Sequence, residues 1–218
     1  MIFLECPKLE GEQINGLKQD RINMAYRTKL NGNNKKIAEK MLKDIVMICE
    51  ECNINYWLEG GTLLGIYREN RLLPWDNDLD ISVSNSEVLK FEKLFYLLKK
   101  YNYRFRVRYF KRNSYPFKEG RIRIIKIREK KFFGLLKGNV CFEIFVKYPH
   151  RKKFYWKIAE KIKSVPEKFY KSFSKVSFQG HNYSIPEFTE DYLKYRYGDW
   201  KKQVKSWDPE KDDLALKQ

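Results

Sequence analysis

The stretch from Gly60 to Ile81, GGTLLGIYRENRLLPWDNDLDI, places the aspartates Asp76, Asp78 and Asp80 within five residues, shortly after a glycine pair. Side chains alternate along a β-strand, so the three carboxylates would point to one face, with neighbours about 7 Å apart. Like charges at this spacing repel one another unless a cation lies between them. The stretch therefore predicts a cation site that is built on a strand.

Mg²⁺ suits such a site, because it binds through one or two carboxylates together with substrate phosphates. Mn²⁺ is the alternative. Two ions can flank an in-line displacement at phosphorus, which requires a third carboxylate from elsewhere in the sheet. Glu143 is the candidate, because it is the only acid in the apolar run VCFEIFV, residues 140–146. Two other interpretations stay open: residues 74–78, PWDND, are also typical of a solvated turn, and Glu143 could pair with an arginine.

The glycine pair follows a short apolar run, residues 55–59, which predicts a turn from a strand into a helix. Backbone N–H groups of Gly60 and Gly61 at such a turn, with the hydroxyl of Thr62, can approach a phosphate closely. The acidic cluster and a phosphate cradle are thus expected side by side.

Hydrophobic periodicity predicts one compact α+β unit over residues 33–218, preceded by an irregular segment, residues 1–32. The sheet is expected to be mixed and flanked by helices, with a helical C-terminal segment. Helices are predicted over 33–52, 84–98 and 187–197, the second opened by a capping box from Ser84 to Glu87. Strands are predicted over 55–59, 79–83, 103–111, 121–128 and 139–147.

A basic stretch, residues 151–175, holds nine Lys or Arg and two Glu, interleaved with aromatic residues. Phe154, Ile158 and Ile162 recur at helical spacing among lysines, which predicts a basic amphipathic helix ahead of Pro166. Such a helix either packs its apolar stripe on the core or rests on an anionic membrane.

The composition indicates which kind of partner the protein binds. Lys and Arg number 45 and Asp and Glu 28, so the net charge of +17 favours anionic partners such as nucleotide phosphates, nucleic acid or an acidic membrane surface. The sequence shows no basic leader and no apolar run long enough for a membrane span, so a cytoplasmic protein is expected. The four cysteines, Cys6, Cys49, Cys52 and Cys141, are expected to be reduced, and redox or metal chemistry at Cys49-x-x-Cys52 is the alternative.

The glycine turn, the Asp-x-Asp strand and a third acid on a later strand resemble the nucleotidyltransferase superfamily. The longer string GGTLLGIYRENRLLPWDNDLDI resembles the LicD family in particular, including Arg68 after the turn and Pro-Trp-Asp before the acids. Residues 143–145 are Glu-Ile-Phe where that family usually has Asp-Ile-Phe. The C-terminal segments 178–180, 185–186 and 192–200 extend the resemblance over roughly residues 35–208.

The resemblance implies a nucleotidyltransferase-like fold and a Mg²⁺-dependent transferase. It would move a phosphorylated group, such as phosphocholine or a polyol phosphate, from a CDP-activated donor to a sugar hydroxyl of a cell-surface glycan. Acceptors of this kind are commonly built on a lipid carrier at the cytoplasmic membrane face. Fukutin-type ribitol-phosphate transferases share this core. Asp78 and Asp80 are then expected to bind metal, and Glu143 to be the third ligand or the base. Asp76 is expected to be an outer ligand or a partner of Arg68.

Several further residues have two interpretations. Arg68 and Arg71 would clamp the donor diphosphate or merely neutralise the aspartates. Arg104, Arg106 and Arg108 would line a groove for an anionic acceptor or form a solvated strand face. His150 and His181 have no spaced partner and are expected at the surface. Residues 197–200, YGDW, would close over the donor or cap a helix.

Two other classes of function stay open. A nucleotidyltransferase that uses an NTP on RNA or a small molecule would share the acidic site, although the sequence carries no RNA-binding signature. A non-catalytic basic protein that binds membrane or RNA would need none of the acids.

Overall fold

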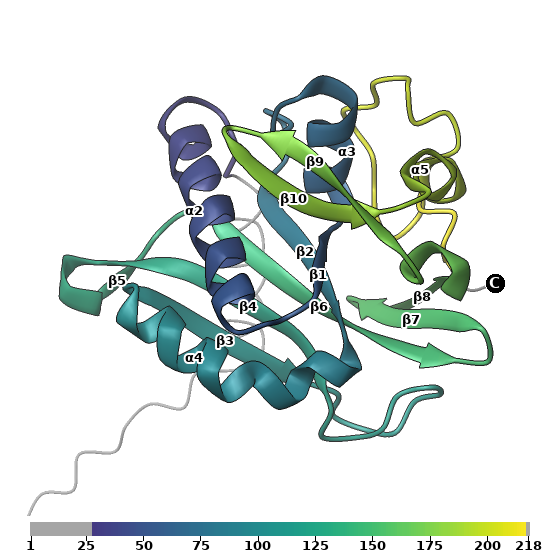
Figure 1. Ribbon diagram of the computed structural model, residues 1–218, viewed down its shortest axis with the longest axis horizontal. Coiled ribbons are helices and arrows are strands. Elements are labelled where there is room, and N and C mark those ends of the chain that lie inside the picture. The colour runs from purple at the N-terminus through teal and green to yellow at the C-terminus, as the bar shows by residue number, and fades with distance from the viewer. Residues whose placement is uncertain (1–27, 217–218) are drawn as a thin grey trace, which may run out of the picture.

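An eight-stranded mixed sheet forms the centre of the protein, whose computed structural model describes residues 28–216 (Figure 1). Its main path runs β1-β2-β6-β4-β3, in which β2 and β6 are parallel and the other neighbours antiparallel. A separate hairpin, β9–β10, lies beside β1. The strands are β1 Tyr56–Leu58, β2 Asp78–Ser84, β3 Tyr103–Tyr109, β4 Ile122–Lys131, β5 Leu136–Lys137, β6 Cys141–His150, β7 Lys153–Ile158, β8 Lys161–Pro166, β9 Phe173–Phe178 and β10 His181–Pro186.

Two helices, α2 and α4, lie side by side across one face of this sheet (Figure 1). Each has an apolar stripe, including Met41 and Ile45 of α2 and Leu94 and Leu98 of α4, and all four side chains are completely buried. The helices are α2 Gly32–Glu51, α3 Gly60–Glu69, α4 Phe91–Lys100 and α5 Thr189–Tyr197, with short 3₁₀ turns at η1 Asn85–Lys90, η2 Phe132–Gly134 and η3 Glu167–Tyr170.

Strand alternation gives the sheet two chemically different faces. Leu79 and Ile81 of β2 and Phe142 and Ile144 of β6 are completely buried. The residues between them, Asp78, Asp80 and Glu143 among others, point to the opposite face. At this level of β2 and β6 the sheet therefore has apolar core side chains on one face and the three carboxylates on the other.

The predicted fold class is confirmed: the protein is α+β, with a mixed sheet flanked by helices and a helical C-terminal segment. Predicted strands match β1, β2, β3, β4 and β6 to within a few residues at their ends. The predicted N-terminal segment 1–32 falls mostly outside the described residues, and Gly32 already belongs to α2.

The predicted capping box is wrong. Ser84 makes no side-chain capping bond, residues Asn85–Lys90 form a 3₁₀ turn, and α4 begins only at Phe91. The carboxylate of Glu87 instead accepts hydrogen bonds from the backbone N–H of Asn55 (3.1 Å) and from Lys90 (2.7 Å). A tertiary contact has therefore replaced the local one.

The predicted amphipathic helix in residues 151–175 is also wrong, because this stretch forms the hairpin β7–β8, the turn η3 and the start of β9. Phe154, Trp156 and Ile158 also fit an alternating pattern, and their aromatic and β-branched side chains favour a strand. Trp156 is buried, and β7 pairs with both β6 and β8. The amphipathic helix on which the alternative of a membrane contact rested is therefore absent from residues 151–175.

The C-terminal segment follows the sequence pattern more closely. Gln179 and Gly180 form the left-handed turn between β9 and β10. Helix α5 ends at Tyr197, as predicted, with Gly198 as its C-cap, although it begins at Thr189 and not at residue 187. None of the helices in residues 28–216 combines the length and the apolar character that crossing a bilayer requires.

Candidate active site

The three predicted metal ligands meet on the polar face of the sheet. Asp80 and Glu143 are register partners on the parallel strands β2 and β6, and Asp78 lies opposite Cys141. One carboxylate oxygen from each of Asp78, Asp80 and Glu143 lies within 4.8 Å of the others. Parallel pairing of β2 with β6, which the sequence did not reveal, is what brings acids 63 positions apart together, as 143 − 80 shows.

The glycine turn lies directly over these acids. A Cβ atom added to Gly60 would come within 2.3 Å of Asp80 Oδ2, and one added to Gly61 within 1.8 Å of Asp76 Oδ2. Gly60 also has a φ of +58°, in the left-handed region that glycine tolerates best. Both glycines are therefore required for the turn to sit against the carboxylates.

Thr62 links the turn to the acidic strand, because its hydroxyl accepts a hydrogen bond from the backbone N–H of Asp80 (2.9 Å). The first intrahelical bond of α3 runs from Leu63 N–H to Glu59 O, so the N–H groups of Gly61 and Thr62 precede the intrahelical ladder. The positive end of α3 thus faces the carboxylates, as an anion-binding helix terminus would.

Burial and mutual repulsion raise the pKa values of the aspartates in the cluster. Burial, followed by repulsion from Glu143, raises the pKa of Asp78 well above its usual range, and burial with the charge of Asp78 does the same for Asp80. Burial raises the pKa of Asp76 to about 6. Three hard oxygen donors that repel one another at this distance fit a divalent cation such as Mg²⁺ or Mn²⁺.

Glu143 has a positive neighbour that the sequence analysis missed. Lys126, its register partner on β4, forms an ion pair with Oε1 of Glu143, and the thiol of Cys141 donates to the same oxygen at 3.7 Å. Burial alone would lower the pKa of Lys126, but attraction to Glu143 raises it above its ordinary value. This contact is compatible with both interpretations of Glu143, as a salt-bridge partner and as a metal ligand.

In the described part of the chain, neither Arg68 nor Arg71 forms an ion pair or hydrogen bond with the aspartates. Both bind Glu69, at 2.5 Å each, and Arg68 also donates to the carbonyls of Trp200 (2.9 Å) and Lys202 (3.3 Å). Asp76 accepts instead from the N–H of Asn77. The predicted pairing of Asp76 with Arg68 is therefore absent among residues 28–216.

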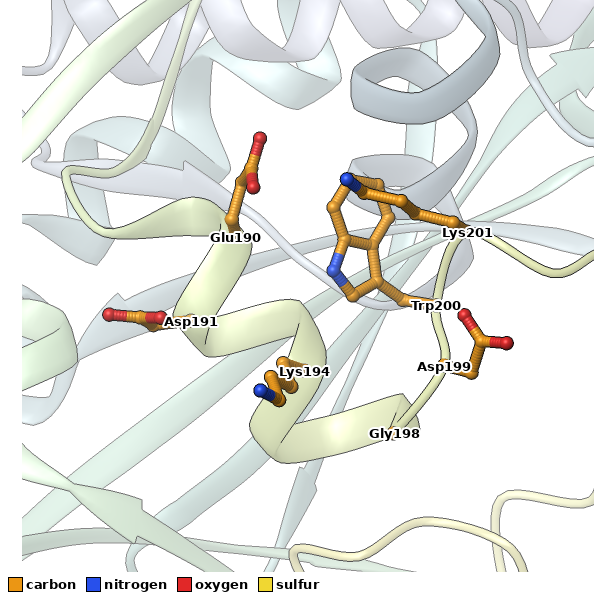
Figure 2. Close-up of a pocket in the computed structure, with 7 residues that line it drawn as sticks. All are labelled: Glu190, Asp191, Lys194, Gly198, Asp199, Trp200 and Lys201. Carbon is orange, nitrogen blue, oxygen red and sulfur yellow. The ribbon is translucent and has the colours of Figure 1, made fainter.

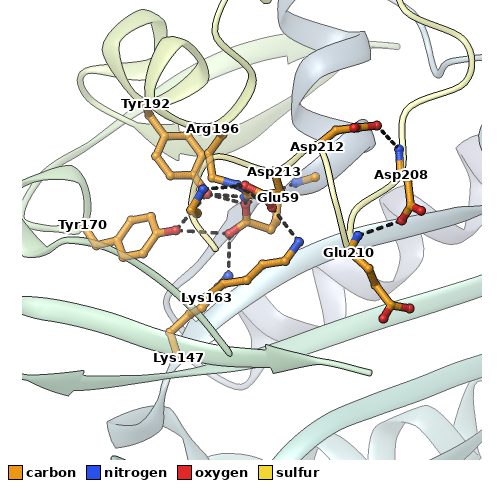
Figure 3. Close-up of polar contacts among 12 residues, drawn as sticks. Glu59, Lys147, Lys163, Tyr170, Tyr192, Arg196, Asp208, Glu210, Asp212 and Asp213 are labelled. Carbon is orange, nitrogen blue, oxygen red and sulfur yellow. Dashed lines mark hydrogen bonds and ion pairs between the residues drawn. The ribbon is translucent and has the colours of Figure 1, made fainter. Parts of the chain in front are cut away.

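A buried ionic network lies behind the glycine turn, centred on Glu59, which the sequence analysis did not single out (Figure 3). Glu59 is 3% exposed and its Oε1 lies 2.6 Å from Arg196 Nη1 of α5. Arg196 in turn binds Asp213 (2.6 Å), which also binds Lys163 (2.6 Å). Further bonds to Glu59 come from Ser82, Tyr170, Tyr192 and Lys147.

The network connects Lys163 of β8, Arg196 of α5 and Asp213 to Glu59, which contacts the acidic strand β2. The backbone N–H of Glu59 donates to Asp80 O (3.1 Å), and its carboxylate accepts from Gly60 N–H (3.2 Å). Burial alone would raise the pKa of Glu59, but the charges of Lys147 and Arg196 hold it well below its usual range. Burial lowers the pKa of Lys147 to about 7. The charged partners in this network come from separate segments of the chain, so no local sequence pattern predicts it.

A groove between α5 and the loop that follows it is shown in Figure 2. It is lined by Glu190, Asp191, Lys194, Gly198, Asp199, Trp200 and Lys201, and by none of the acids in the cluster. The ring of Trp200 packs on Tyr67 of α3, with centroids 5.8 Å apart. Residues 197–200 thus cap α5 and pack on α3, which agrees with the structural interpretation of this motif.

Arginines of β3 extend the polar face. Arg104, Arg106 and Arg108 are exposed, and Arg106 is the register partner of Lys126. Across residues 28–216 none of the three forms an ion pair with an acid. One row of the sheet therefore runs from Asp80 through Glu143 and Lys126 to Arg106, from acidic to basic.

The cysteines and the histidines are the remaining candidate residues. Cys49, Cys52 and Cys141 are buried free thiols, as predicted, whereas Cys6 lies outside the described residues. The two histidines, His150 and His181, were predicted at the surface, but both side chains are only partly exposed. His181 lies 3.5 Å from Glu50, and His150 packs edge-on against Tyr115.

A family model described as LicD/FKTN/FKRP, nucleotidyltransferase domain, matches residues 53–187, which contain the glycine turn, the aspartates and Glu143. The chain belongs to this family. The family model covers residues 53–187, a shorter span than residues 35–208, over which the sequence motifs resemble the LicD family.

Relatives in the LicD/FKTN/FKRP family include enzymes. Homo sapiens ribitol 5-phosphate transferase FKRP is 40% identical over 50 residues, 23% of this chain and 10% of FKRP. Haemophilus influenzae lipopolysaccharide cholinephosphotransferase LicD is 41% identical over 44 residues, 20% of this chain and 17% of that protein. The chain spans less than a third of the length of the curated relatives it matches.

A solved structure also shows some likeness. The crystal structure of ANT(2")-Ia in complex with adenylyl-2"-tobramycin matches with a TM-score of 0.40 and 14% identity, over 72% of this chain and 74% of that chain.

Proposed function

We propose that this protein transfers a phosphorylated alcohol, such as phosphocholine or a polyol phosphate, from a CDP-activated donor to a sugar hydroxyl of a cell-surface glycan. The observation that carries the proposal is the meeting of Asp78, Asp80 and Glu143 within 4.8 Å, under a glycine turn. Its chemistry is supported by two relatives, which are named as a ribitol 5-phosphate transferase and a cholinephosphotransferase.

In the proposed reaction, the acceptor hydroxyl attacks the phosphorus distal to the cytidine. A bond forms from the sugar oxygen to that phosphorus, the bond from phosphorus to the bridging oxygen breaks, and CMP leaves. The hydroxyl proton passes to a carboxylate of the cluster, with Glu143 either in that role or as a third ligand. Mg²⁺ or Mn²⁺ held by Asp78, Asp80 and Glu143 would neutralise charge on the phosphates and on the leaving oxygen.

The residues around the acids have complementary roles in this proposal. Gly60 and Gly61 let the turn approach the diphosphate, and Thr62 positions Asp80 through its hydrogen bond. Lys126, beside Glu143, can contact a phosphate oxygen on the open face. Asp76 serves as an outer ligand.

Arg68 and Arg71 differ as donor-binding candidates. The side chain of Arg71 is 44% exposed, binds Glu69 and lies with its guanidinium 6.0 Å from the centre of the Trp75 ring, so it can turn toward a diphosphate. That of Arg68 is 9% exposed and bound to two carbonyls, which favours a structural role. An acceptor that is built on a lipid carrier would place the protein at the cytoplasmic face of the membrane.

A panel of donors tests the proposal: CDP-choline, CDP-ribitol, CDP-glycerol and CDP-ethanolamine are incubated with the protein, Mg²⁺ and candidate glycans, and CMP release is measured. We expect one donor to be used well above the others. Transfer of a nucleotide from ATP or CTP to RNA or to a small molecule, without CMP release from any CDP donor, would overturn it and favour an ordinary nucleotidyltransferase.

A further inference from the structure

The hairpin formed by β4 and β5 ends in an apolar tip that none of the residues 28–216 covers. Phe132 is 69% exposed, Phe133 fully exposed, Leu135 83% and Leu136 54%. Single apolar residues are common on protein surfaces, but four large ones within five positions form a contiguous patch. In Figure 1 this hairpin projects at the left of the molecule, on the side away from α5.

The backbone presents the two aromatic rings outward at a conformational cost. Phe132 and Phe133 have φ values of +48° and +54°, in the left-handed region that bulky residues rarely adopt. Because these rings are exposed, folding of the described chain provides no burial that compensates for this strain. An apolar partner outside the chain would provide it.

The base of the tip is positively charged. Lys130 on β4 and Lys137 on β5 are register partners, so two like charges lie directly opposite each other, an arrangement that is unfavourable in isolation. Lys131 adds a third charge next to Leu136, its own register partner. In the described part of the chain these three lysines form no ion pair with an acid. Anionic groups beside the tip would relieve the repulsion.

The tip lies at the same end of the sheet as the carboxylates. Because β4 is antiparallel to β6, with Ile127 opposite Phe142, it continues past Cys141, the first residue of β6. Asp78, which begins β2, lies opposite Cys141. Lys131 is therefore on the order of 10 Å beyond the level of Asp78 along the strand direction.

We propose that the hairpin tip, residues 130–137, inserts its apolar side chains into an anionic lipid bilayer, with Lys130, Lys131 and Lys137 at the level of the headgroups. The combination of an apolar end with a basic base matches the layered chemistry of such a surface, where lysines extend toward phosphates while apolar groups enter the acyl region. Docking in this way would hold the acidic cluster close to the membrane. It requires no nucleotide or acceptor, so it can be tested independently of the proposed function.

Co-sedimentation with vesicles tests the inference. The full chain is incubated with vesicles of phosphatidylcholine alone, or of equal parts phosphatidylcholine and phosphatidylglycerol, at low salt. We expect binding to the acidic vesicles, a loss of at least tenfold in affinity for a Phe132→Ser, Phe133→Ser variant, and a similar loss when Lys130, Lys131 and Lys137 are changed to Gln.

Two control variants separate insertion from general effects of surface change. Leu89→Ser removes an apolar side chain that is 93% exposed on η1, and a triple Lys→Gln variant at Lys36, Lys43 and Lys100 removes three exposed charges from the helical layer. Both should bind acidic vesicles as the wild type does. Equal losses in these controls, absence of wild-type binding, or dimers that depend on Phe132 and Phe133 without vesicle binding would each overturn the inference.

Discussion

The carboxylate of Glu59 and the guanidinium of Arg196 lie 2.6 Å apart although 137 residues separate them in the chain. Glu59 is also the residue before the glycine turn, and its backbone N–H binds Asp80 O. Helix α5 and the segment around Asp213 thus contact the residue that precedes the glycine turn. The C-terminal part of the chain therefore helps to position the turn and the acidic strand.

Glu59→Gln should strongly destabilise the protein. It removes the negative partner of the buried Lys147 and one of the two negative partners of Arg196, and an uncompensated buried charge typically costs about 3–5 kcal/mol of unfolding free energy. Denaturant titration measures this loss. Glu160→Gln, which removes an exposed partner of Lys157, is the control and should change stability little. Equal effects of the two substitutions would show that the network does not stabilise the fold.

Gly60→Ala should impair activity beyond its effect on stability. Forcing a Cβ into the left-handed region costs about 1–2 kcal/mol, and this Cβ would also displace the carboxylate of Asp80. Gly120→Ala is the matched control, because Gly120 has a φ of +76° but no atom within 4 Å of an added Cβ. We expect similar losses of stability and a loss of CMP release only for Gly60→Ala; comparable activities would contradict the close approach of turn and acid.

The metal-free protein should become less stable as the pH rises from about 5 to about 7.5. Burial and mutual repulsion raise the folded-state pKa values of Asp76, to about 6, and of Asp78 and Asp80. The stability that these groups contribute is present below their unfolded pKa and is lost as the pH rises through the folded pKa. Thermal melting in EDTA measures the trend.

Asp78→Asn should raise the melting temperature of the metal-free protein at about pH 7.5 and weaken its dependence on pH, since it removes one of the repelling charges. Glu119→Gln, at an exposed acid outside the cluster, is the control. A lower melting temperature for Asp78→Asn than for the control variant would mean that repulsion among the acids is not a significant term.

Cytidine diphosphate esters should raise the melting temperature in Mg²⁺ and do little in EDTA, because a diphosphate that shares a cation with the acids binds the folded state only. Thermal shift with CDP-choline, CDP-ribitol, ATP and CTP measures the preference. Equal stabilisation by ATP and CTP would favour nucleotide transfer instead.

Local sequence predicted much of the fold. Alternation predicted β2 and β3, the apolar run of residues 140–146 predicted β6, and the apolar spacing of residues 33–52 predicted α2. In these segments the apolar side chains that form the pattern are the ones that the fold buries. Residues 151–175 fitted two periodicities at once, and pairing of β7 with β6 and β8 selected the strand. Glu87 fitted a local cap but binds Asn55 from the preceding loop.

The candidate site was predictable where its residues share one strand or one turn. Asp78 and Asp80 are neighbours in sequence, and the apolar surroundings of Glu143 made it stand out. Lys126 and Arg196 did not stand out, because lysine and arginine are abundant in this chain and only strand register or helix packing selects these two.

The rate of CMP release from the preferred CDP donor, compared between the wild type and Asp80→Asn, tests the central claim most directly. Circular dichroism and thermal melting establish that both proteins are folded. If the acids form the metal-dependent centre, the wild type will release CMP in Mg²⁺ but not in EDTA, and folded Asp80→Asn will lose at least about a hundredfold in rate, roughly 2.7 kcal/mol of barrier. Wild-type rates in EDTA, or full activity of Asp80→Asn, would contradict the account.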